Sequence, residues 1–418
     1  MTRTTLMTTP GDDELDLLHA VAESSRLHLV EATRVHGEAG PDGFVTGYRV
    51  RLADEAGRQI ERFVYVTTEP RGGDRDGVLR MRDESGDERA VWVYPNDPRL
   101  PALARAVVPS QAREVLESFG PGHVWAHDAS GVGPPVGRES ELTLVVAAYR
   151  PGKRAVVRAT LGGLRAYLKV VPPGRAERIH ARHEVWRAAG IPVPRPLGWT
   201  EQGIVGLAEQ PGRAASEALD RADPDRLLDG IAALRRRIAQ LPSNADARGS
   251  LGGRVDWYTR RTAMRDPELE PRLRSIRASV DRLLAETTAE RVTIHGDLHL
   301  GQLFVDEHDP SRVAGVIDID TAGTGDPADD DAALWAHLIA TATHAAAHAA
   351  TAGDLVRAER AETLADRARS RWSADGADGA DRADRIAAIA ATHLLGHALT
   401  GSLPAADAVA RAEGLVQR

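Results

Sequence analysis

The chain has 418 residues, a formal net charge of -8 and no cysteine. This length is enough for two or three domains, each with a core of its own. The negative charge gives a nucleic-acid partner no overall electrostatic support, and the lack of cysteine excludes disulfides, thiolate metal sites and a cysteine nucleophile.

The sequence predicts neither a membrane segment nor a secretory signal. No apolar run approaches the roughly 20 residues that span a bilayer. Residues 1–13 turn acidic before any apolar signal region appears. We therefore expect a cytoplasmic protein without a membrane partner. The sequence gives no indication of its oligomeric state.

The first 125 residues are expected to form an α+β cap subdomain. Its elements are a helix, three alternating strands separated by turn residues, and a second helix, at residues 14–35, 47–52, 62–66, 90–94 and 103–117. The Gly- and Pro-rich stretch 120–137 then predicts a domain boundary.

Two further parts are expected, a β-rich lobe at 138–212 and a helical lobe at 213–418. The β-rich lobe begins with three strands joined by Pro151-Gly152 and Gly162-Gly163. Its remaining elements are a helix over 175–189 and a strand over 203–207. Helices of the last part are expected at 224–240, 268–287, 329–351, 354–372 and as a pair within 382–417.

Lysine is rare in this chain, because only Lys153 and Lys169 among the 53 basic residues are lysines. A lysine that persists in such an arginine-rich chain indicates a need for a compact, flexible ammonium. Lys169 falls on the third strand of the β-rich lobe, and Glu184 lies in the helix that follows. Kinases hold the phosphates of ATP with a strand lysine paired to a helix carboxylate. The structural alternative is a snorkelling lysine and a solvated glutamate.

The strongest functional signal is the segment His-Gly-Asp-Leu-His-Leu-Gly-Gln, from His295 to Gln302. It offers a base, Asp297, and an amide oxygen five positions later, and a short apolar strand then delivers a second carboxylate, Asp318. A kinase catalytic loop and its metal-binding aspartate have their parts in this order. Phosphoryl transfer needs a carboxylate to accept the hydroxyl proton and hard oxygen ligands to hold Mg²⁺ on the phosphates.

A hairpin is expected to bring the two halves of this segment together. Residues 303–305 and 312–317 are apolar runs separated by a turn rich in Asp and Pro, so the carboxylates before and after them can converge on one metal ion. Asp320 would point to the same side as Asp318 if the strand continues, and would then add a ligand.

The same segment has a second interpretation as a metal-hydrolase site, because imidazoles and a carboxylate at His295, His299 and Asp297 suit Zn²⁺. The sequence shows no other matching histidine pair in an ordered context, and His337 is expected on the packed or solvated face of a helix. The hydrolase hypothesis leaves Lys169 unexplained, so the kinase is favoured.

These motifs, with Ile-Asp-Ile-Asp and Gly-Asp-Pro after them, resemble the aminoglycoside phosphotransferase family, which has the protein-kinase-like fold. Gln302, where most members have Asn, is similar to the actinobacterial maltokinases and the related glucosamine kinases, which also carry an N-terminal cap. The resemblance covers residues 141–345 by motif. It implies an α+β, two-lobe kinase fold preceded by a cap at residues 1–125.

The resemblance also implies roles for single residues. Asp297 would orient and deprotonate the acceptor hydroxyl, and His295 would support the loop by hydrogen bonding. The expected Mg²⁺ ligands are Gln302, Asp318 and Asp320. The residues expected at ATP are the phosphate-binding Lys169 with its partner Glu184, Lys153 of a turn that has one glycine in place of G-x-G-x-x-G, and the hinge residues Leu207, Glu209 and Gln210.

We therefore predict an ATP- and Mg²⁺-dependent phosphotransferase whose small-molecule acceptor is a hydroxyl of a sugar or amino sugar, glucosamine- or maltose-like. An aminoglycoside antibiotic is the alternative acceptor. Asp320 and the acidic run Asp329–Asp331 could attract an ammonium, which favours amino sugars or aminoglycosides. Helix capping accounts equally well for that run, as for Asp326. A pseudokinase binding module is also possible, although it would usually lack Asp297, Asp318 or Lys169.

Overall fold

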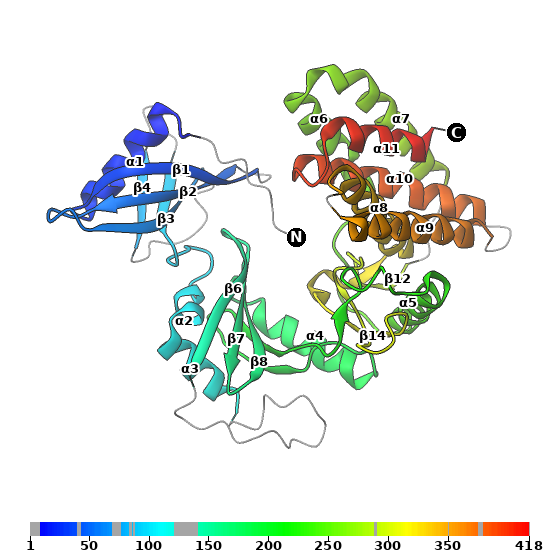
Figure 1. The fold of residues 1–418 in the computed structure, drawn as a ribbon, viewed down its shortest axis with the longest axis horizontal. Coiled ribbons are helices and arrows are strands. Elements are labelled where there is room, and N and C mark those ends of the chain that lie inside the picture. Colours follow the sequence, from blue (N-terminus) through cyan, green and yellow to red (C-terminus); the bar gives the residue numbers. More distant parts are fainter. Residues whose placement is uncertain are drawn as a thin grey trace. The chain divides into compact units, whose positions relative to one another are not determined.

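The structure, a computed structural model, describes residues 9–39, 43–68, 77–82, 86, 88–120, 141–287, 291–349, 351–374 and 379–417. The chain divides into two compact units (Figure 1). The N-terminal unit contains residues up to 181 and residues 195–209, and the C-terminal unit contains residues 182–194 and those from 210 onward. The chain passes from one unit to the other for the last time between Glu209 and Gln210, within the predicted hinge Leu207–Gln210.

The first sheet of the N-terminal unit has five antiparallel strands in the order β1-β2-β3-β5-β4. The strands are β1 (His28–Ala39), β2 (Phe44–Ala53), β3 (Gln59–Thr67), β4 (Val78–Arg82) and β5 (Glu88–Val93). Helix α1 (Asp12–Ser24) packs on this sheet through Leu18 and Val21, which share a core with Tyr48 and Val91. The meander predicted from the sequence is therefore confirmed, with two strands more than expected.

The first predicted helix is wrong beyond Ser24. Arg26 has a positive φ of 55°, which ends the helical turn. The chain then pairs with β2 from His28 to Ala39, with two irregularities in the register. Long-range pairing with β2 thus decides the conformation of a segment whose local pattern also suits a helix.

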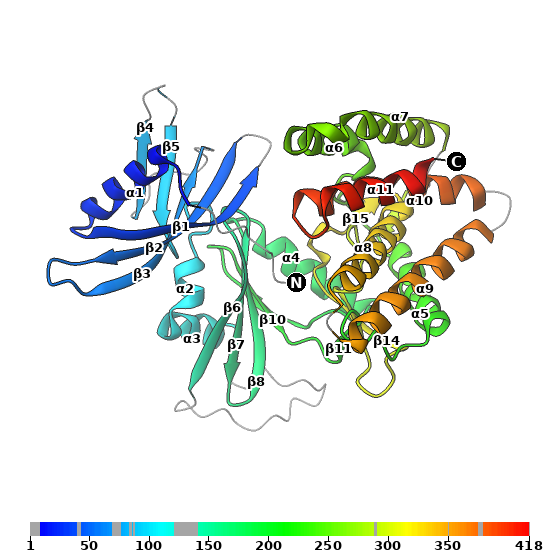
Figure 2. The same cartoon turned by 45° about the horizontal axis from the view of Figure 1, so that its top comes forward.

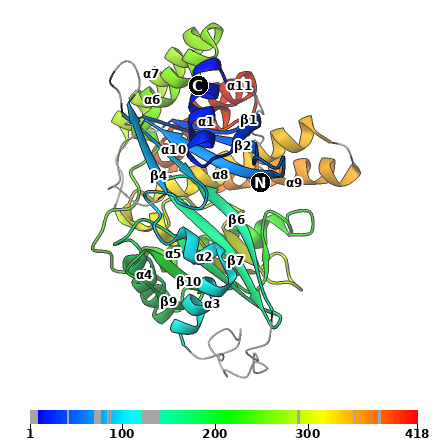
Figure 3. The ribbon, with the colours of Figure 1, turned by 90° about the vertical axis from the view of Figure 1, so that its left-hand side faces the viewer.

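The second sheet of this unit is also antiparallel, in the order β6-β7-β8-β10-β9. Its strands are β6 (Leu142–Arg150), β7 (Arg154–Leu161), β8 (Leu164–Val170), β9 (Pro196–Trp199) and β10 (Ile204–Ala208). Helices α2 (Leu103–Val107) and α3 (Pro109–Ser118) lie against it in Figure 3 and supply Leu103, Val115 and Leu116 to its core. Pro109 starts α3 and divides the single helix that was expected.

The two sheets are joined by hydrogen bonds at the β6–β7 turn. The buried carboxylate of Asp97 accepts bonds from the Gly152 backbone N–H at 2.6 Å and from the Tyr149 hydroxyl at 2.8 Å. Glu38 of β1 pairs with Lys153 at 2.8 Å and also with Arg150. The predicted boundary at 120–137 lies, except for Gly120, outside the described residues.

The C-terminal unit is mainly helical (Figure 2). Its long helices are α5 (Pro224–Ala239), α6 (Val255–Arg265), α7 (Glu270–Glu286), α8 (Pro327–Ala347), α9 (Ala352–Ala374), α10 (Gly379–Leu399) and α11 (Ala405–Val416). Helix α4 (Ala176–Ala188) runs across the division between the units. All of these except α6 were predicted. The short strands are β11 (Arg213–Ala214), β12 (Val292–Ile294), β13 (Leu303–Val305), β14 (Val313–Val316) and β15 (Gly323–Gly325).

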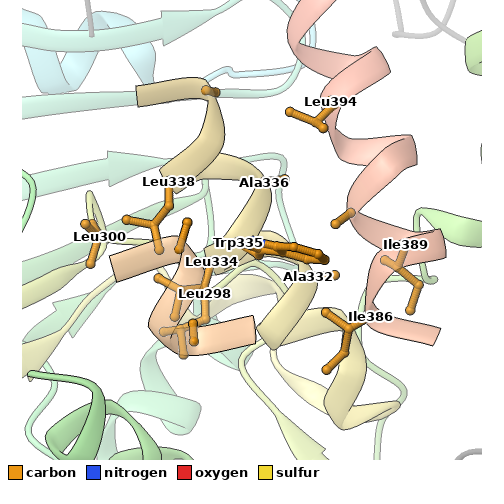
Figure 4. Close-up of a cluster of buried hydrophobic side chains, with 14 of the residues drawn as sticks. Leu298, Leu300, Ala332, Leu334, Trp335, Ala336, Leu338, Ile386, Ile389 and Leu394 are labelled. Atoms are coloured by element: carbon orange, nitrogen blue, oxygen red, sulfur yellow. The ribbon is translucent and has the colours of Figure 1, made fainter. Parts of the chain in front are cut away.

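Apolar side chains of α8 and α10 form the centre of this unit together with the chain around the catalytic motif (Figure 4). Leu298 and Leu300 of the motif belong to the same buried cluster as Trp335 and Leu338 of α8 and Ile389 of α10. Burial of such residues stabilises a fold by about 1.5–3 kcal/mol per side chain. The motif is therefore held by the core of the unit.

No helix of the described residues is long and apolar enough to cross a membrane.

Candidate active site

The predicted hairpin is present and brings Gln302 and Asp318 to the same end of two paired strands. Leu303 of β13 pairs with Val316 of β14, and the Ile317 N–H donates to the carbonyl oxygen of Gln302 at 2.9 Å. Gln302 immediately precedes β13, whereas Asp318 follows β14 by two residues.

A buried carboxylate on α8 holds the backbone of the loop that carries Asp297, the candidate catalytic loop. Asp330 accepts hydrogen bonds from the N–H groups of His295 at 2.9 Å and Gly296 at 2.8 Å. The sequence had suggested a helix cap for Asp330, but the cap of α8 is Asp326, which accepts from the Ala328 N–H at 2.9 Å. Asp330 reaches the loop because β12 ends beside the first turn of α8.

Gly296 and His295 shape the loop in two further ways. Gly296 has φ +81°, and a Cβ atom there would lie 2.6 Å from the carbonyl oxygen of Thr321. The His295 ring donates from Nε2 to the carbonyl oxygen of Ile317 at 2.9 Å, which links the loop to the end of β14. This contact is consistent with the supporting role that was expected of His295.

Asp297, the expected base, is paired with an arginine that the sequence did not single out. Arg248 Nη1 and Nη2 lie 3.5 and 3.4 Å from the two carboxylate oxygens of Asp297. The backbone of Arg248 is itself fixed, since its N–H donates to the Thr321 carbonyl oxygen at 2.9 Å. Both side chains are partly exposed, at 33% and 26%. With 51 arginines in the chain, nothing local to Arg248 marked it out.

Gln302 and Asp318 have features that fit a divalent cation. The side-chain oxygen Oε1 of Gln302 is buried and has no hydrogen-bond partner among the described residues, which is unusual for a buried oxygen. Asp318 has a left-handed backbone, φ 60° and ψ 43°. A residue other than glycine in this region is held there by its surroundings, often at a functional site. Hard oxygen atoms such as these are suitable ligands for Mg²⁺.

Asp320 was expected to lie on the same side as Asp318 if the strand continued through both residues. The strand does not continue, because β14 ends at Val316 and residues Ile319–Thr321 form a 3-10 turn. The alternation that would put Asp318 and Asp320 on one side therefore stops before them. Arg182 of α4 donates to the carbonyl oxygens of Ile319 and Asp320 at 2.9 and 2.8 Å, and so fixes this turn.

Four histidines meet beside Asp297 in what we call the histidine cluster: His299, His337, His393 and His397. The rings of His299 and His337 are stacked with centroids 4.0 Å apart, and those of His337 and His397 meet edge to face at 4.6 Å. His393 lies one turn before His397 on α10 and is within the electrostatic influence of Asp297 and Arg248. His337 therefore packs, as the sequence predicted, but its contacts with the rings of His299 and His397 were not foreseen.

Burial lowers the pKa of every imidazole in the cluster. It brings the pKa of His393 to about 3 and that of His397 to about 4. Burial also places the pKa of His337 well below its usual value, and lowers the pKa of His299 despite the opposing effect of the Asp297 carboxylate. All four rings are therefore uncharged at neutral pH.

The acidic run Asp329–Asp331 is not available to a ligand's ammonium. Asp331 is buried between Arg235 and Arg382, and Asp329 accepts a bond from the Ser250 hydroxyl at 2.6 Å. Burial raises the pKa of Asp329 to about 6. The expectation that this run attracts an amine is wrong, since all three carboxylates have internal partners.

The residues expected at the nucleotide lie mostly in the N-terminal unit. Lys169 is buried on β8, the central strand of the second sheet, and Leu207 lies on β10 beside it. Glu209 pairs with Arg165 at 3.1 Å, and Gln210 donates to the carbonyl oxygen of Ala314 at 3.3 Å. Glu184 is exposed on α4, in the C-terminal unit. Lys153 is paired with Glu38 at the β6–β7 turn.

The zinc-hydrolase hypothesis finds no ligand set in the part of the chain that the structure describes. No three His, Cys, Asp or Glu side chains there form a group that could hold a metal ion. His295 Nε2 is bonded to a carbonyl oxygen, and His299 Nδ1 accepts from the Gly301 N–H at 3.1 Å. A magnesium site does not need such a group, because Mg²⁺ uses one or two carboxylates with water and phosphate oxygens.

Similar solved structures are phosphotransferases. A thermostable mutant of aminoglycoside phosphotransferase APH(4)-Ia, in a ternary complex with AMP-PNP and hygromycin B, is 15% identical over 66% of this chain and 93% of that chain, with TM-score 0.46. Aminoglycoside phosphotransferase APH(3'')-Id from Streptomyces rimosus, with ADP and streptomycin, is 21% identical over 68% and 99%, with TM-score 0.39. Macrolide 2'-phosphotransferase MphH from Brachybacterium faecium is 17% identical over 68% and 95%, with TM-score 0.38.

The family is assigned by the sequence of the catalytic region itself. No curated protein sequence matches the chain. The model of the phosphotransferase enzyme family (APH) matches residues 150–372, which is more than half of the chain and contains most of the β-rich lobe, the motif around Asp297 and the hairpin. The chain therefore belongs to the APH phosphotransferase enzyme family, as a small-molecule kinase with a kinase-like α+β fold.

Proposed function

We propose that this protein transfers the γ-phosphate of ATP to a hydroxyl of a sugar or amino sugar. The observation that carries the proposal is the placement of Asp297, Gln302 and Asp318 on one loop and hairpin, whose backbone Asp330 fixes by two hydrogen bonds. Phosphoryl transfer requires a base and oxygen ligands in fixed positions, because an enzyme catalyses this reaction mostly by positioning the reactants and stabilising charge.

In this proposal Asp297 orients the acceptor hydroxyl and accepts its proton as the oxygen attacks the γ-phosphorus. The leaving group is ADP, and the proton ends on the Asp297 carboxylate before it passes to water. Arg248 holds both carboxylate oxygens from one side, which fixes the direction of the base. Removing that arginine would leave the carboxylate free to rotate away from the acceptor.

Gln302 Oε1 and Asp318 would hold Mg²⁺, and Asp320 is a further candidate ligand. When bound, the ion neutralises charge on the phosphates of ATP. The Gln302 amide keeps its oxygen in place because the residue is buried at the start of β13. Asp318 is presented by its left-handed backbone at the end of β14.

The nucleotide roles of the other residues remain predictions. Lys169 would contact the ATP phosphates with Glu184 as its partner, and Lys153 would lie near them. Leu207, Glu209 and Gln210 would meet the adenine. The support for Lys169 is its position on the central strand of the second sheet, next to β10, the strand that leads into the predicted hinge.

The proposal is tested by ATP consumption with Mg²⁺ against a panel of sugars, amino sugars, aminoglycosides and choline-like alcohols. We expect ADP and a phosphorylated sugar in equal amounts, and loss of both products when the metal is chelated. Nucleotide-independent hydrolysis that Zn²⁺ supports would contradict the proposal. A chain that neither binds nor turns over ATP would contradict it too, and would be consistent with a binding module.

A further inference from the structure

The surroundings of Asp297 contain a guanidinium and several imidazoles. On the proposed function, the hydroxyl that is phosphorylated must reach Asp297, so the groups next to this carboxylate meet the rest of the acceptor. Those groups are Arg248 and the histidine cluster. We propose that Arg248 and the histidine cluster form the acceptor subsite and select an uncharged, hydroxyl-rich sugar over one that carries an ammonium beside the reacting hydroxyl.

The hydrogen-bonding capacity of the cluster matches hydroxyl groups. A neutral imidazole has one donor and one acceptor nitrogen, and a sugar hydroxyl can both donate and accept. His299 uses Nδ1 to accept the Gly301 N–H, which leaves the proton on Nε2 as a donor. Within the described residues, the ring nitrogens of His337, His393 and His397 have no hydrogen-bond partner, so their capacity remains for a ligand or water.

The charges around the subsite oppose an ammonium. The Asp297 carboxylate acts on His299, His393 and His397, and Arg248 already pairs with it. Asp318 also acts on His299, but in the proposed function this carboxylate is a ligand of Mg²⁺. An ammonium placed here would lose water and meet a guanidinium and neutral rings instead of a counter-charge. The carboxylates of Asp329–Asp331 do not balance its charge, because each already has an internal partner. A hydroxyl at the same place avoids this cost.

The test compares kcat/KM for matched neutral and amino sugars, such as glucose with glucosamine, together with an aminoglycoside. At pH 7, where the amines are mostly protonated, we expect the neutral member of a pair to be favoured by at least about tenfold, since a site built for hydroxyls discriminates well against unmatched groups. Raising the pH should bring the two kcat/KM values closer together as the amine loses its charge. A preference caused by the shape of the sugar would not change in this way.

Two variants locate the effect. His393→Asp adds a carboxylate beside Asp297 and should shift the neutral-to-amino ratio toward the amine by about tenfold. Arg248→Met removes the cation from a partly exposed position and should shift the ratio in the same direction. His344→Asn, which changes an exposed histidine two turns further along α8, is the matched control and should leave the ratio unchanged.

The inference is overturned if the amino sugar consistently has the higher kcat/KM. It is also overturned if neither His393→Asp nor Arg248→Met changes the neutral-to-amino ratio of kcat/KM. Both results would leave the proposed kinase function standing. The same holds if no sugar is phosphorylated while ATP is still hydrolysed slowly. If ATP is neither bound nor turned over, the proposed function itself fails.

Discussion

A single carboxylate fixes the backbone of the candidate catalytic loop. Asp330 is only 2% exposed, and its two oxygens accept the N–H groups of His295 and Gly296. An ionised carboxylate has acceptors only, so both loop N–H groups meet a lone pair. The position of Asp297, the next residue, depends directly on this pair of bonds.

Asp330→Asn should disturb the loop while changing little of the side chain's volume. The amide turns one acceptor oxygen into an N–H donor that faces another donor. We expect a loss of about 1–3 kcal/mol in the free energy of unfolding, as for a buried donor left unsatisfied. We also expect at least about tenfold lower kcat, because the base shifts. Urea denaturation and steady-state kinetics measure these effects. The surface variant Asp366→Asn on α9 is the control, and wild-type values for Asp330→Asn would contradict the account.

At the scale of elements, helices α8 and α10 meet through histidines as well as through apolar residues. His393 and His397 lie on α10, His337 lies on α8, and the rings of His337 and His397 contact each other. Since burial lowers the pKa of His393 to about 3 and that of His397 to about 4, the folded chain resists protonating them. The unfolded chain protonates them near the ordinary value of about 6.5.

Because of this difference in pKa between the folded and unfolded chain, the packing of α8 against α10 should become less stable in acid. Stability from the neutral histidines is fully present above pH 6.5 and is lost as the pH falls toward 4, because the unfolded state then binds more protons. Each histidine can contribute at most about 1.4 kcal/mol per pH unit. The unfolding free energy, measured with urea at pH 7 and pH 5, should therefore fall less for His393→Asn than for the wild-type chain. Equal falls would contradict the prediction, and His344→Asn serves as the control.

The second sheet offers a comparison between the chain's two lysines. Lys169 is buried on the central strand β8, whereas the side chain of Lys153 is 43% exposed and its ammonium is paired with Glu38. Burial alone would raise the pKa of the Glu38 carboxyl. The hydrogen bonds and positive charges of Arg150 and Lys153 outweigh this effect and lower the pKa of Glu38 to about 2.

Lys169→Met should therefore weaken ATP binding more than Lys153→Met does. We expect at least about a tenfold loss of affinity for Lys169→Met, which corresponds to about 1.4 kcal/mol, and a smaller loss for Lys153→Met. The rise in melting temperature on adding ATP reports the affinity, since a ligand of the folded state stabilises it by mass action. Equal losses for the two variants would contradict the assignment of Lys169.

Local patterns in the sequence predicted the elements whose pattern is strong. The hairpin β13–β14, the strand that carries Lys169 and most helices follow from apolar periodicity, turn residues and the motif around Asp297. Strand β1 was missed because its pairing with β2 is decided by residues distant in the chain. Arg248, Asp330 and the histidine cluster were missed for the same reason, since no local pattern links position 248 with 297 or 337 with 397.

At the scale of the whole molecule, the core of the second sheet extends beyond the family region, residues 150–372. Leu103, Val115 and Leu116 of α2 and α3 are buried with β7 and β8, and Asp97 accepts the Gly152 N–H. The predicted division between residues 1–125 and 138–212 thus separates side chains that share one core.

A shortened chain tests this organisation. Residues 138–418 should fail to fold cooperatively, because the second sheet loses the helices that cover one face. Residues 96–418 keep α2, α3 and Asp97 and should retain a cooperative thermal transition, although at lower temperature. Circular dichroism on both chains checks this. A stable, cooperative 138–418 chain would show that the first 125 residues are a separate cap, as the sequence first suggested.

The most direct test of the central claim, that Asp297 is the base of a small-molecule kinase, is the transfer rate of Asp297→Asn with an accepted sugar. The amide keeps the shape of the side chain but cannot take the hydroxyl proton. We expect transfer to fall by about 10²–10⁴-fold, the usual contribution of general base catalysis, while ATP still raises the melting temperature. Asp309→Asn, at the far end of the same hairpin, should transfer phosphate at the wild-type rate. A wild-type transfer rate in Asp297→Asn would contradict the account.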